Sequence, residues 1–161
     1  MFVPLDEMPT TARVWVFMCD RELEKGEVEQ ISFAIRPFLD EWTAHQQSLH
    51  SSYAIVYDRF LIIAVDEAFT SASGCSIDKS VAFVKSVEQR LNCNFMNRLL
   101  FGYKSEGRVS VATKEEFERL IDAGVIQDET IVFDNLVDTL HALNHRWEVP
   151  FERSWHKVLV G

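Results

Sequence analysis

Residues 13–19, with the sequence RVWVFMC, constrain the fold most, because they predict a strand that is apolar on both faces. Successive side chains of a strand point to opposite sides of a sheet. Val14 and Val16 therefore share one face, and Trp15 and Phe17 share the other. Both faces of the resulting sheet have to be covered, by helices, by another part of the chain or by a second copy of the protein.

The order of the predicted elements is typical of a split βαβ unit, in which two helices cover one face of an antiparallel sheet. Apolar residues at helical spacing predict helices over residues 27–44 and 76–91. Pro37 predicts a kink or a break in the first helix. Short apolar runs predict further strands at residues 52–57, 60–65 and 98–103. We therefore expect an α+β fold with a ferredoxin-like βαββαβ core and right-handed crossovers.

The remaining residues predict a smaller unit that covers the second face of the sheet. Thr113 and Glu116 form a capping-box pattern, which predicts a short helix ending at Gly124. A predicted strand at residues 130–133 and a predicted helix at residues 135–145 follow. A dimer partner is the alternative cover for this face. The predicted units are a ferredoxin-like core at residues 1–105 and a C-terminal α/β subdomain at residues 106–161, packed on the core.

Charge and composition exclude several classes of partner. The net charge is −9 without a cluster of Lys or Arg, so neither nucleic acid nor an anionic membrane surface is an expected partner. The longest apolar run, residues 60–65, is far too short to cross a bilayer. Three cysteines without a CxxC pair, and an N-terminal sequence unlike a signal peptide, predict a cytoplasmic protein with reduced thiols. The composition fits either a monomer or a homodimer.

The stretch SASGCSIDKS, residues 71–80, contains some residues of a phosphate-binding loop but not its pattern. A Walker A loop has a glycine directly before its Lys-Ser pair, because several backbone N–H groups have to point at the phosphate. Here Asp78 stands directly before Lys79, and its carboxylate would repel a phosphate. The sequence therefore does not predict nucleotide hydrolysis.

Cys75 is the strongest candidate for a nucleophile. It lies near the predicted start of a helix, where the helix dipole and free N–H groups stabilise a thiolate. A nucleophile needs a base, and the candidates are His45, His50 and His156. The predicted topology brings the turn with His45 to the same edge of the sheet, which we name the Cys75 rim. We predict Cys75 and His45 as the catalytic residues of this rim. The residues predicted to bind a ligand there are Trp42, His50, Asp66, Ser73, Ser76 and Lys79.

The same residues also fit ordinary structural roles. Ser76 is a common N-cap residue, and Asp78 in the first turn of a helix complements the dipole. A lone buried cysteine usually behaves as a small hydrophobic residue. No metal and no cofactor is predicted, because the rim residues with suitable side chains match no strong ligand spacing. Those residues are His45, His50, Asp66 and Glu67.

Five stretches span nearly the whole chain: MPTTARVWVF, EWTAHQQSLHSSYAIVYDRFLIIAVDE, SGCSIDKSV, TIVFDNLV and WEVPFERSWH. Together they resemble a small bacterial family of similar length that is labelled "ABC transporter ATPase". That label implies ATP hydrolysis, but this sequence has neither a Walker A loop nor an LSGGQ-like signature. Residues 107–134 are similar in outline to a GYF-like module, which presents a surface for proline-rich peptides, although the Gly-Tyr-Phe signature is absent.

The sequence favours a non-catalytic binding or regulatory module that takes a small ligand or a protein. The binding surface would be the Cys75 rim or the aromatic region from Trp147 to Trp155, which contains Pro150. The alternative is a small thiol-dependent enzyme with Cys75 as nucleophile and His45 as base. Binding is favoured because the sequence identifies no complete set of nucleophile, base and orienting residue.

Overall fold

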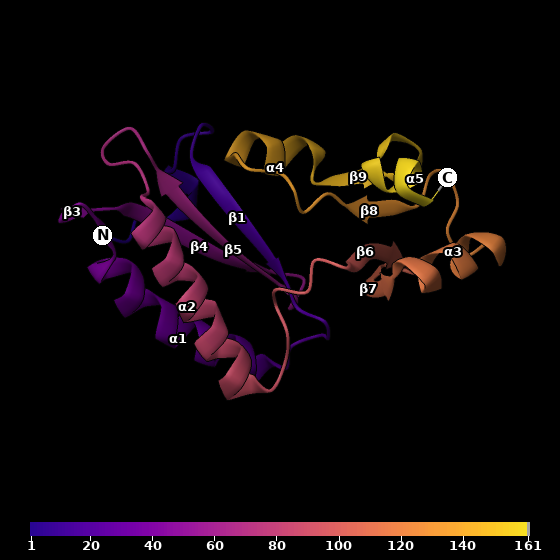
Figure 1. The fold of residues 1–161 in the computed structure, drawn as a ribbon, viewed down its shortest axis with the longest axis horizontal. Helices are drawn as coiled ribbons and strands as arrows, with labels where there is room; N and C mark the ends of the chain where they lie inside the picture. The colour runs from indigo at the N-terminus through magenta and orange to yellow at the C-terminus, as the bar shows by residue number, and fades with distance from the viewer. Residues whose placement is uncertain (161) are drawn as a thin grey trace.

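The computed structural model describes residues 1–160, which form an α+β protein with two main antiparallel sheets (Figure 1). The helices are Lys25–Glu41 (α1), Gly74–Leu91 (α2), Lys114–Asp122 (α3), Leu140–Arg146 (α4) and Trp155–Val160 (α5), with short 3₁₀ turns at Leu5–Glu7 (η1) and Phe151–Arg153 (η2). The strands are Arg13–Met18 (β1), Thr43–Ala44 (β2), Gln47–Ser48 (β3), His50–Val56 (β4), Phe60–Asp66 (β5), Leu100–Ser105 (β6), Arg108–Thr113 (β7), Ile131–Phe133 (β8) and Glu148–Pro150 (β9).

The first sheet has the strand order β1-β5-β4, and both pairs of neighbours are antiparallel. β4 and β5 are joined by a tight turn at Tyr57 and Asp58, whose φ angles are 55° and 51°. The register pairs Val56 with Phe60, so the turn has three residues, and the Arg59 N–H donates to the Val56 carbonyl at 3.1 Å. The chain therefore contains the first three strands of the pattern predicted from the sequence, in the expected order.

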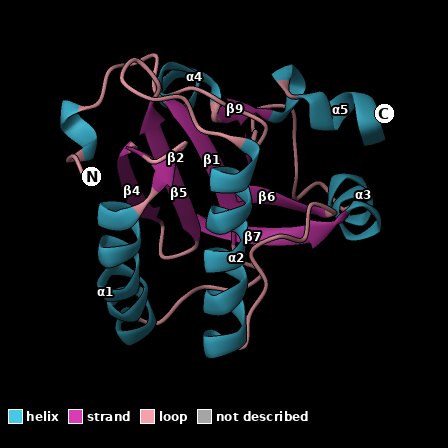
Figure 2. Ribbon diagram, turned by 60° about the vertical axis from the view of Figure 1, so that its left-hand side comes forward, coloured by secondary structure: helices cyan, strands magenta, loops and turns pink. Residues whose placement is uncertain are grey.

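α1 and α2 lie side by side on one face of the first sheet (Figure 2). The buried side chains between these layers include Phe17 and Ile63 from the sheet, Ile35 from α1 and Val84 from α2. α1 continues through Pro37, so the helix is not broken there. The two helices thus leave the opposite face of the sheet to be covered by other residues.

The predicted fourth strand of this sheet lies in a different sheet. β6 pairs with β7 along its whole length and with β8 at Tyr103 and Val132, in a second sheet of order β7-β6-β8-β9. The ferredoxin-like core is therefore not confirmed, because that fold places the fourth strand beside β1. β6 and β7 are joined by a short turn in which Glu106 and Gly107 have positive φ angles of 53° and 75°. Pairing with a neighbour so close in sequence costs little loop-closure entropy.

Residues from the C-terminal part of the chain cover the other face of the first sheet. Phe60 of β5 packs against Phe133 and Trp147, with ring centroids 4.7 and 4.8 Å apart. The close approach of the two sheets depends on Gly102 in β6, because a Cβ atom there would lie 2.7 Å from the Met18 Sδ. These contacts place a cover where the apolar second face of β1 and β5 requires one.

Candidate functional site: a slot along a strand edge

The structure brings the two turns of the Cys75 rim to one edge of the first sheet. Trp42, directly after α1, donates its Nε1–H to the Ser76 carbonyl in the first turn of α2 at 2.9 Å. His50 and Asp66 are paired across β4 and β5. The His50 ring also stacks on Phe69, with centroids 3.9 Å apart. Residues far apart in sequence thus meet at this rim.

The start of α2 is stabilised by a reciprocal pair of serines. Ser73 is the N-cap residue, so the assignment of the cap to Ser76 from sequence is wrong. The Ser76 N–H donates to the Ser73 Oγ at 3.1 Å, and the Ser73 N–H donates to the Ser76 Oγ at 2.7 Å. Ser76 is buried, and both hydroxyl groups are occupied by the cap.

Cys75 and His45 are both exposed, and no hydrogen bond joins them within residues 1–160. His45 lies in the turn between β2 and β3 with a φ of 50°, and Lys79 is exposed further along α2. Within the part of the chain that the structure describes, no three His, Cys, Asp or Glu side chains are arranged to hold a metal ion. The catalytic and ligand-binding roles of the rim residues therefore stay predictions.

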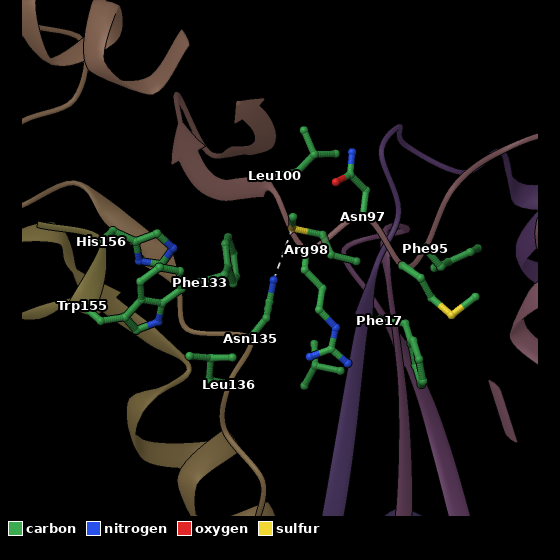
Figure 3. Close-up of a pocket in the computed structure, with 13 residues that line it drawn as sticks. Phe17, Phe95, Asn97, Arg98, Leu100, Phe133, Asn135, Leu136, Trp155 and His156 are labelled. Carbon is green, nitrogen blue, oxygen red and sulfur yellow. Dashed lines mark hydrogen bonds between the residues drawn. The ribbon is translucent and has the colours of Figure 1, made fainter. Parts of the chain in front are cut away.

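A second candidate site, which the sequence did not indicate, lies along the outer edge of β1 (Figure 3). It is a cavity of about 100 Å³ that adjoins a second hollow of about 160 Å³. Its walls come from β1, from the linker between α2 and β6, and from the turn after β8. We name it the edge slot and define it by the residues that line both hollows: Val16, Phe17, Arg98, Asn135 and Leu136.

The main chain of β1 borders the edge slot with unpaired N–H groups. The Val14 N–H points away from β5 and donates to the Asp138 carbonyl at 2.9 Å. The Cys19 N–H points to the other side and donates at 2.8 Å to the carbonyl of Arg59, the residue before β5. Alternate residues of a strand direct their N–H groups to the same side. Val16 and Met18 therefore direct theirs away from β5, and neither N–H makes a hydrogen bond within residues 1–160.

Both ends of this open edge are closed by other parts of the chain. At the start of β1, Arg13 and Thr139 form an antiparallel bridge. Just beyond its end, the Asp20 N–H donates to the Asn94 carbonyl at 2.9 Å. The open stretch covers residues 14–18, which is about 13 Å of strand at roughly 3.3 Å per residue.

Arg98 supplies positive charge to the edge slot. Its side chain extends from the linker toward the space between Asn135 and Phe17 (Figure 3). Its guanidinium has no ion-pair partner among residues 1–160. Arg13 lines the second hollow, but it lies 4.0 Å from the carboxylate of Glu67. Arg98 is therefore the slot cation that is most available to an anionic group.

The wall opposite β1 is held in place by indole hydrogen bonds. The Asn135 side chain accepts the Trp147 Nε1–H at 2.9 Å, and its amide nitrogen lies 3.4 Å from the Met18 Sδ as a donor (Figure 3). The neighbouring Asp134 carboxylate accepts the Trp155 Nε1–H at 3.0 Å. These contacts fix the turn after β8, so this wall of the slot is preformed.

His156 lies at the apolar end of the slot. It is 1% exposed and stacks against Trp155 and Phe117. Burial lowers the pKa of His156 to about 4, against the opposing influence of the Asp134 charge, so its imidazole is neutral at pH 7. The buried Ser154 hydroxyl bonds to the His156 Nδ1 and also accepts the His156 N–H. The Ser154 hydroxyl is buried and not accessible to a substrate. Its hydrogen bonds to His156 therefore stabilise the start of α5.

The dimensions of the edge slot decide which ligands it can hold. Pockets for drug-sized ligands and cofactors have volumes of about 300–1,000 Å³, whereas the two hollows of the slot have about 100 and 160 Å³. The slot therefore fits side chains and a short length of main chain. It offers apolar walls, outward N–H groups and one guanidinium.

The sequence did not reveal the edge slot because its parts come from distant segments. Arg98 was placed inside a predicted strand over residues 98–103, whereas β6 begins only at Leu100. The Asn97 Oδ1 accepts the Leu99 N–H at 3.0 Å, which makes this part of the linker a turn. Asn97 was the available signal, since asparagine favours such turns.

Comparisons with protein-family models, with curated proteins and with solved structures find no match to this chain. No helix within residues 1–160 combines the length and apolar character needed to span a membrane. The chemistry of the site therefore has to be inferred from its own geometry.

Proposed function

We propose that the protein is a non-catalytic binding module that receives an extended segment of another protein in the edge slot. The observation that carries this proposal is the pair of outward N–H groups of Val16 and Met18 beside a cavity of side-chain size. An extended peptide on such an edge forms main-chain hydrogen bonds and places alternate side chains in neighbouring pockets.

Exposed apolar side chains beside the slot support a protein partner. Leu99 is 78% exposed and Leu136 is 65% exposed, one on each of the two segments that face β1. Exposed apolar residues grouped around a groove are typical of interaction surfaces. A free strand edge is otherwise a liability that proteins cover or shield.

The size of the slot weighs against the ATP hydrolysis that the label of the resembling family implies. Its two hollows have about 100 and 160 Å³, and neither reaches the lower end of the range of about 300–1,000 Å³ for cofactor pockets. The sequence also lacks a Walker A loop, because Asp78 replaces the required glycine. We therefore infer that the protein does not hydrolyse nucleotides.

Selection from a library of random short peptides tests this function. We expect peptides that bind the wild-type protein and slow the hydrogen exchange of the Val16 and Met18 amides in the complex. The variant Val16→Pro lacks the outward N–H, and we expect it to lose binding at least about tenfold. Val16→Ala is the matched control, because it also loses the valine side chain but keeps the N–H.

The stability of both Val16 variants is measured in the same experiment. A proline on an edge strand is tolerated where its missing N–H faces outward, so we expect Val16→Pro to fold. Peptides that bind without protecting the Val16 and Met18 amides would contradict the proposed function, and so would a library that yields no binder. Protection of these amides in concentrated protein alone would identify a second copy as the occupant instead.

The thiol-dependent enzyme is retained as a second candidate because of one contact. The Trp42–Ser76 hydrogen bond brings the turn with His45 to the rim where Cys75 is exposed. Titration of the native protein with a chromogenic thiol reagent across pH tests this candidate. We expect Cys75 alone to react, and His45→Ala to lower its reactivity if the histidine acts as a base. Reactivity that is unchanged in His45→Ala would remove the catalytic pair.

A further inference from the structure

We infer that the segment bound in the edge slot is the C-terminus of a protein chain, with its α-carboxylate on Arg98 and its strand antiparallel to β1. The inference rests on the proposed function and adds the chemistry of the partner. It is carried by three independent features of the slot: its closed ends, the distribution of its charge and the direction of the segment that already pairs with β1.

The closed ends favour a chain terminus over an internal segment. The Arg13–Thr139 bridge blocks one end of the open edge, and the Asp20–Asn94 hydrogen bond crosses the other. A continuous strand would have to leave the slot through one of these contacts. A chain that enters from the outer side and ends in the slot needs only the open stretch, which accommodates about three or four residues.

The two hollows of the slot differ in chemistry. The hollow toward the start of β1 contains two cationic side chains, Arg13 and Arg98, and one carboxylate, Asp138. The hollow toward the end of β1 has only Arg98 and a neutral histidine among its ionisable groups, and is otherwise largely apolar. Its apolar lining includes Met18, Phe95, Met96, Leu100, Phe133 and Trp155.

This distribution sets the polarity of the bound chain. An α-carboxylate is placed best at the start of β1, near both arginines, and an apolar side chain before it is placed best near the end of β1. A chain in that orientation runs antiparallel to β1. The natural segment at the bridge also runs antiparallel, since Arg13 and Thr139 form an antiparallel pair. The bound terminus would therefore extend an existing pairing pattern.

Two acidic residues lie near this end of the slot. Glu67 lies 4.0 Å from Arg13 and partly neutralises it. Asp138 is exposed, and its main-chain carbonyl is occupied by the Val14 N–H. Of the two arginines, Arg98 is the one without an ion pair within residues 1–160, so it is the residue that a carboxylate would engage. A chain that began in the slot and ran parallel to β1 would bring its α-ammonium group toward the same arginine and be repelled.

The test uses a random peptide library displayed with free C-termini, followed by synthesis of each selected peptide as a free acid and as a C-terminal amide. Fluorescence anisotropy gives the affinity of each form. We expect the amide to bind the wild-type protein about tenfold or more weakly, because it lacks the charge-assisted hydrogen bonds to a guanidinium. We expect Arg98→Gln to bind both forms with equal, weaker affinity.

Two variants serve as controls for charge. Arg98→Lys keeps the positive charge without the fork of donors, so we expect it to retain part of the preference for the free acid. Arg90→Gln removes an exposed arginine at the end of α2, outside the slot, and we expect it to leave the preference unchanged. Arg98 is itself exposed and without an ion pair in residues 1–160, so its substitution should not impair folding.

The results separate failure of this inference from failure of the proposed function. If the free acid and the amide bind equally well, and Val16→Pro still abolishes binding, the slot binds extended segments but does not recognise a terminus. If the selected peptides instead require an internal acidic side chain, the assignment of the α-carboxylate is overturned. Binding that is unaffected by both Arg98→Gln and Val16→Pro would contradict the slot itself.

Discussion

The two outer edges of the first sheet differ in how the chain covers them. On the β4 edge, the N-terminal segment pairs only at Ser51: the Val3 N–H donates to the Ser51 carbonyl at 2.8 Å, and the Ser51 N–H donates to the Met1 carbonyl at 3.0 Å. The N–H groups of Tyr53 and Ile55 point to the same outer side and make no hydrogen bond within residues 1–160. On the β1 edge, other segments pair only at the two ends, and the N–H groups of Val16 and Met18 face a cavity. Both edges therefore keep outward N–H groups without a partner in residues 1–160, and the β1 edge differs because its N–H groups border a cavity.

The difference between the edges comes from β6. In the pattern predicted from the sequence, this strand would pair with β1 and fill the edge. In the structure it forms a hairpin with β7 and meets β1 by packing, as where Gly102 lies against Met18, and not by strand pairing. The linker that carries Arg98 thus passes the edge without pairing with it. The candidate site exists because β6 does not pair with β1, and no additional sequence motif is needed to form it.

The largest expected effect is an alternation in amide exchange along β1. The N–H groups of Trp15 and Phe17 face β5, whereas those of Val16 and Met18 face the slot. In native-state exchange measured by NMR, we expect the first pair to exchange slower than the second by a factor on the order of 1,000 or more. Equal protection of all four amides would show that the outer side of β1 is not open.

The second effect is a loss of stability in mild acid, which tests the packing behind the slot. The pKa of His156 is lowered from 6.5 to about 4 in the folded protein, so the unfolded chain binds the proton first as the pH falls. Stability contributed by the neutral imidazole is complete above pH 6.5 and is lost progressively between pH 6.5 and 4. We expect a decrease of about 3 kcal/mol in the free energy of unfolding.

Urea denaturation across this pH range measures that decrease, and His156→Phe is the comparison variant. Phenylalanine keeps the stacking on Trp155 and Phe117 but cannot bind a proton. We expect the variant to lose most of the pH dependence between pH 6.5 and 4. A variant whose stability falls as steeply as that of the wild type would assign the effect to other groups.

The third effect concerns the contact that brings β6 close to β1. In Gly102→Ala, the new Cβ would lie 2.7 Å from the Met18 Sδ and 3.3 Å from Phe133. We expect a loss of about 1–3 kcal/mol by thermal or chemical unfolding, because the crowded side chains have to move. Gly26→Ala is the control, since a Cβ there has no atom within 4 Å. Equal effects of the two substitutions would show that the sheets are not tightly apposed at Gly102.

The smallest effect tests the pairing of the N-terminal segment with the β4 edge. Val3→Pro removes the N–H that donates to the Ser51 carbonyl, and we expect a loss of about 1 kcal/mol in the free energy of unfolding. Val3→Ala keeps that N–H and serves as the matched variant in the same denaturation experiment. If both variants have the same stability, the N-terminal segment does not hold the β4 edge, and the two edges are more alike than the structure indicates.

The individual helices and strands could be predicted from the sequence, because hydrophobic periodicity and capping patterns depend on residues that are close together in the chain. The predicted helix at 76–91 corresponds to Gly74–Leu91, and the predicted strand at 60–65 corresponds to Phe60–Asp66. The α+β class follows from these elements. The partner of β6 could not be predicted in the same way, because a run such as residues 98–103 pairs equally well with either of two apolar strands.

The candidate site was less accessible to sequence reasoning than the fold. Cys75 and His45 are recognisable in the sequence because cysteine and histidine have distinctive chemistry. In the structure they are exposed on a rim, without a hydrogen bond between them in residues 1–160. The edge slot depends on unpaired backbone groups and on Arg98, which no side-chain motif indicates. Such a site becomes visible only when the sheet topology is known.

The three separate walls of the edge slot have a practical consequence. An occupant would contact β1, the α2–β6 linker and the turn after β8 at the same time. It would therefore link the first sheet to the segments beside the second sheet and stabilise their arrangement. Ligands that bind only the native state raise the melting temperature in proportion to the logarithm of their concentration over Kd. A thermal-shift screen can therefore find the natural partner without any assay of activity.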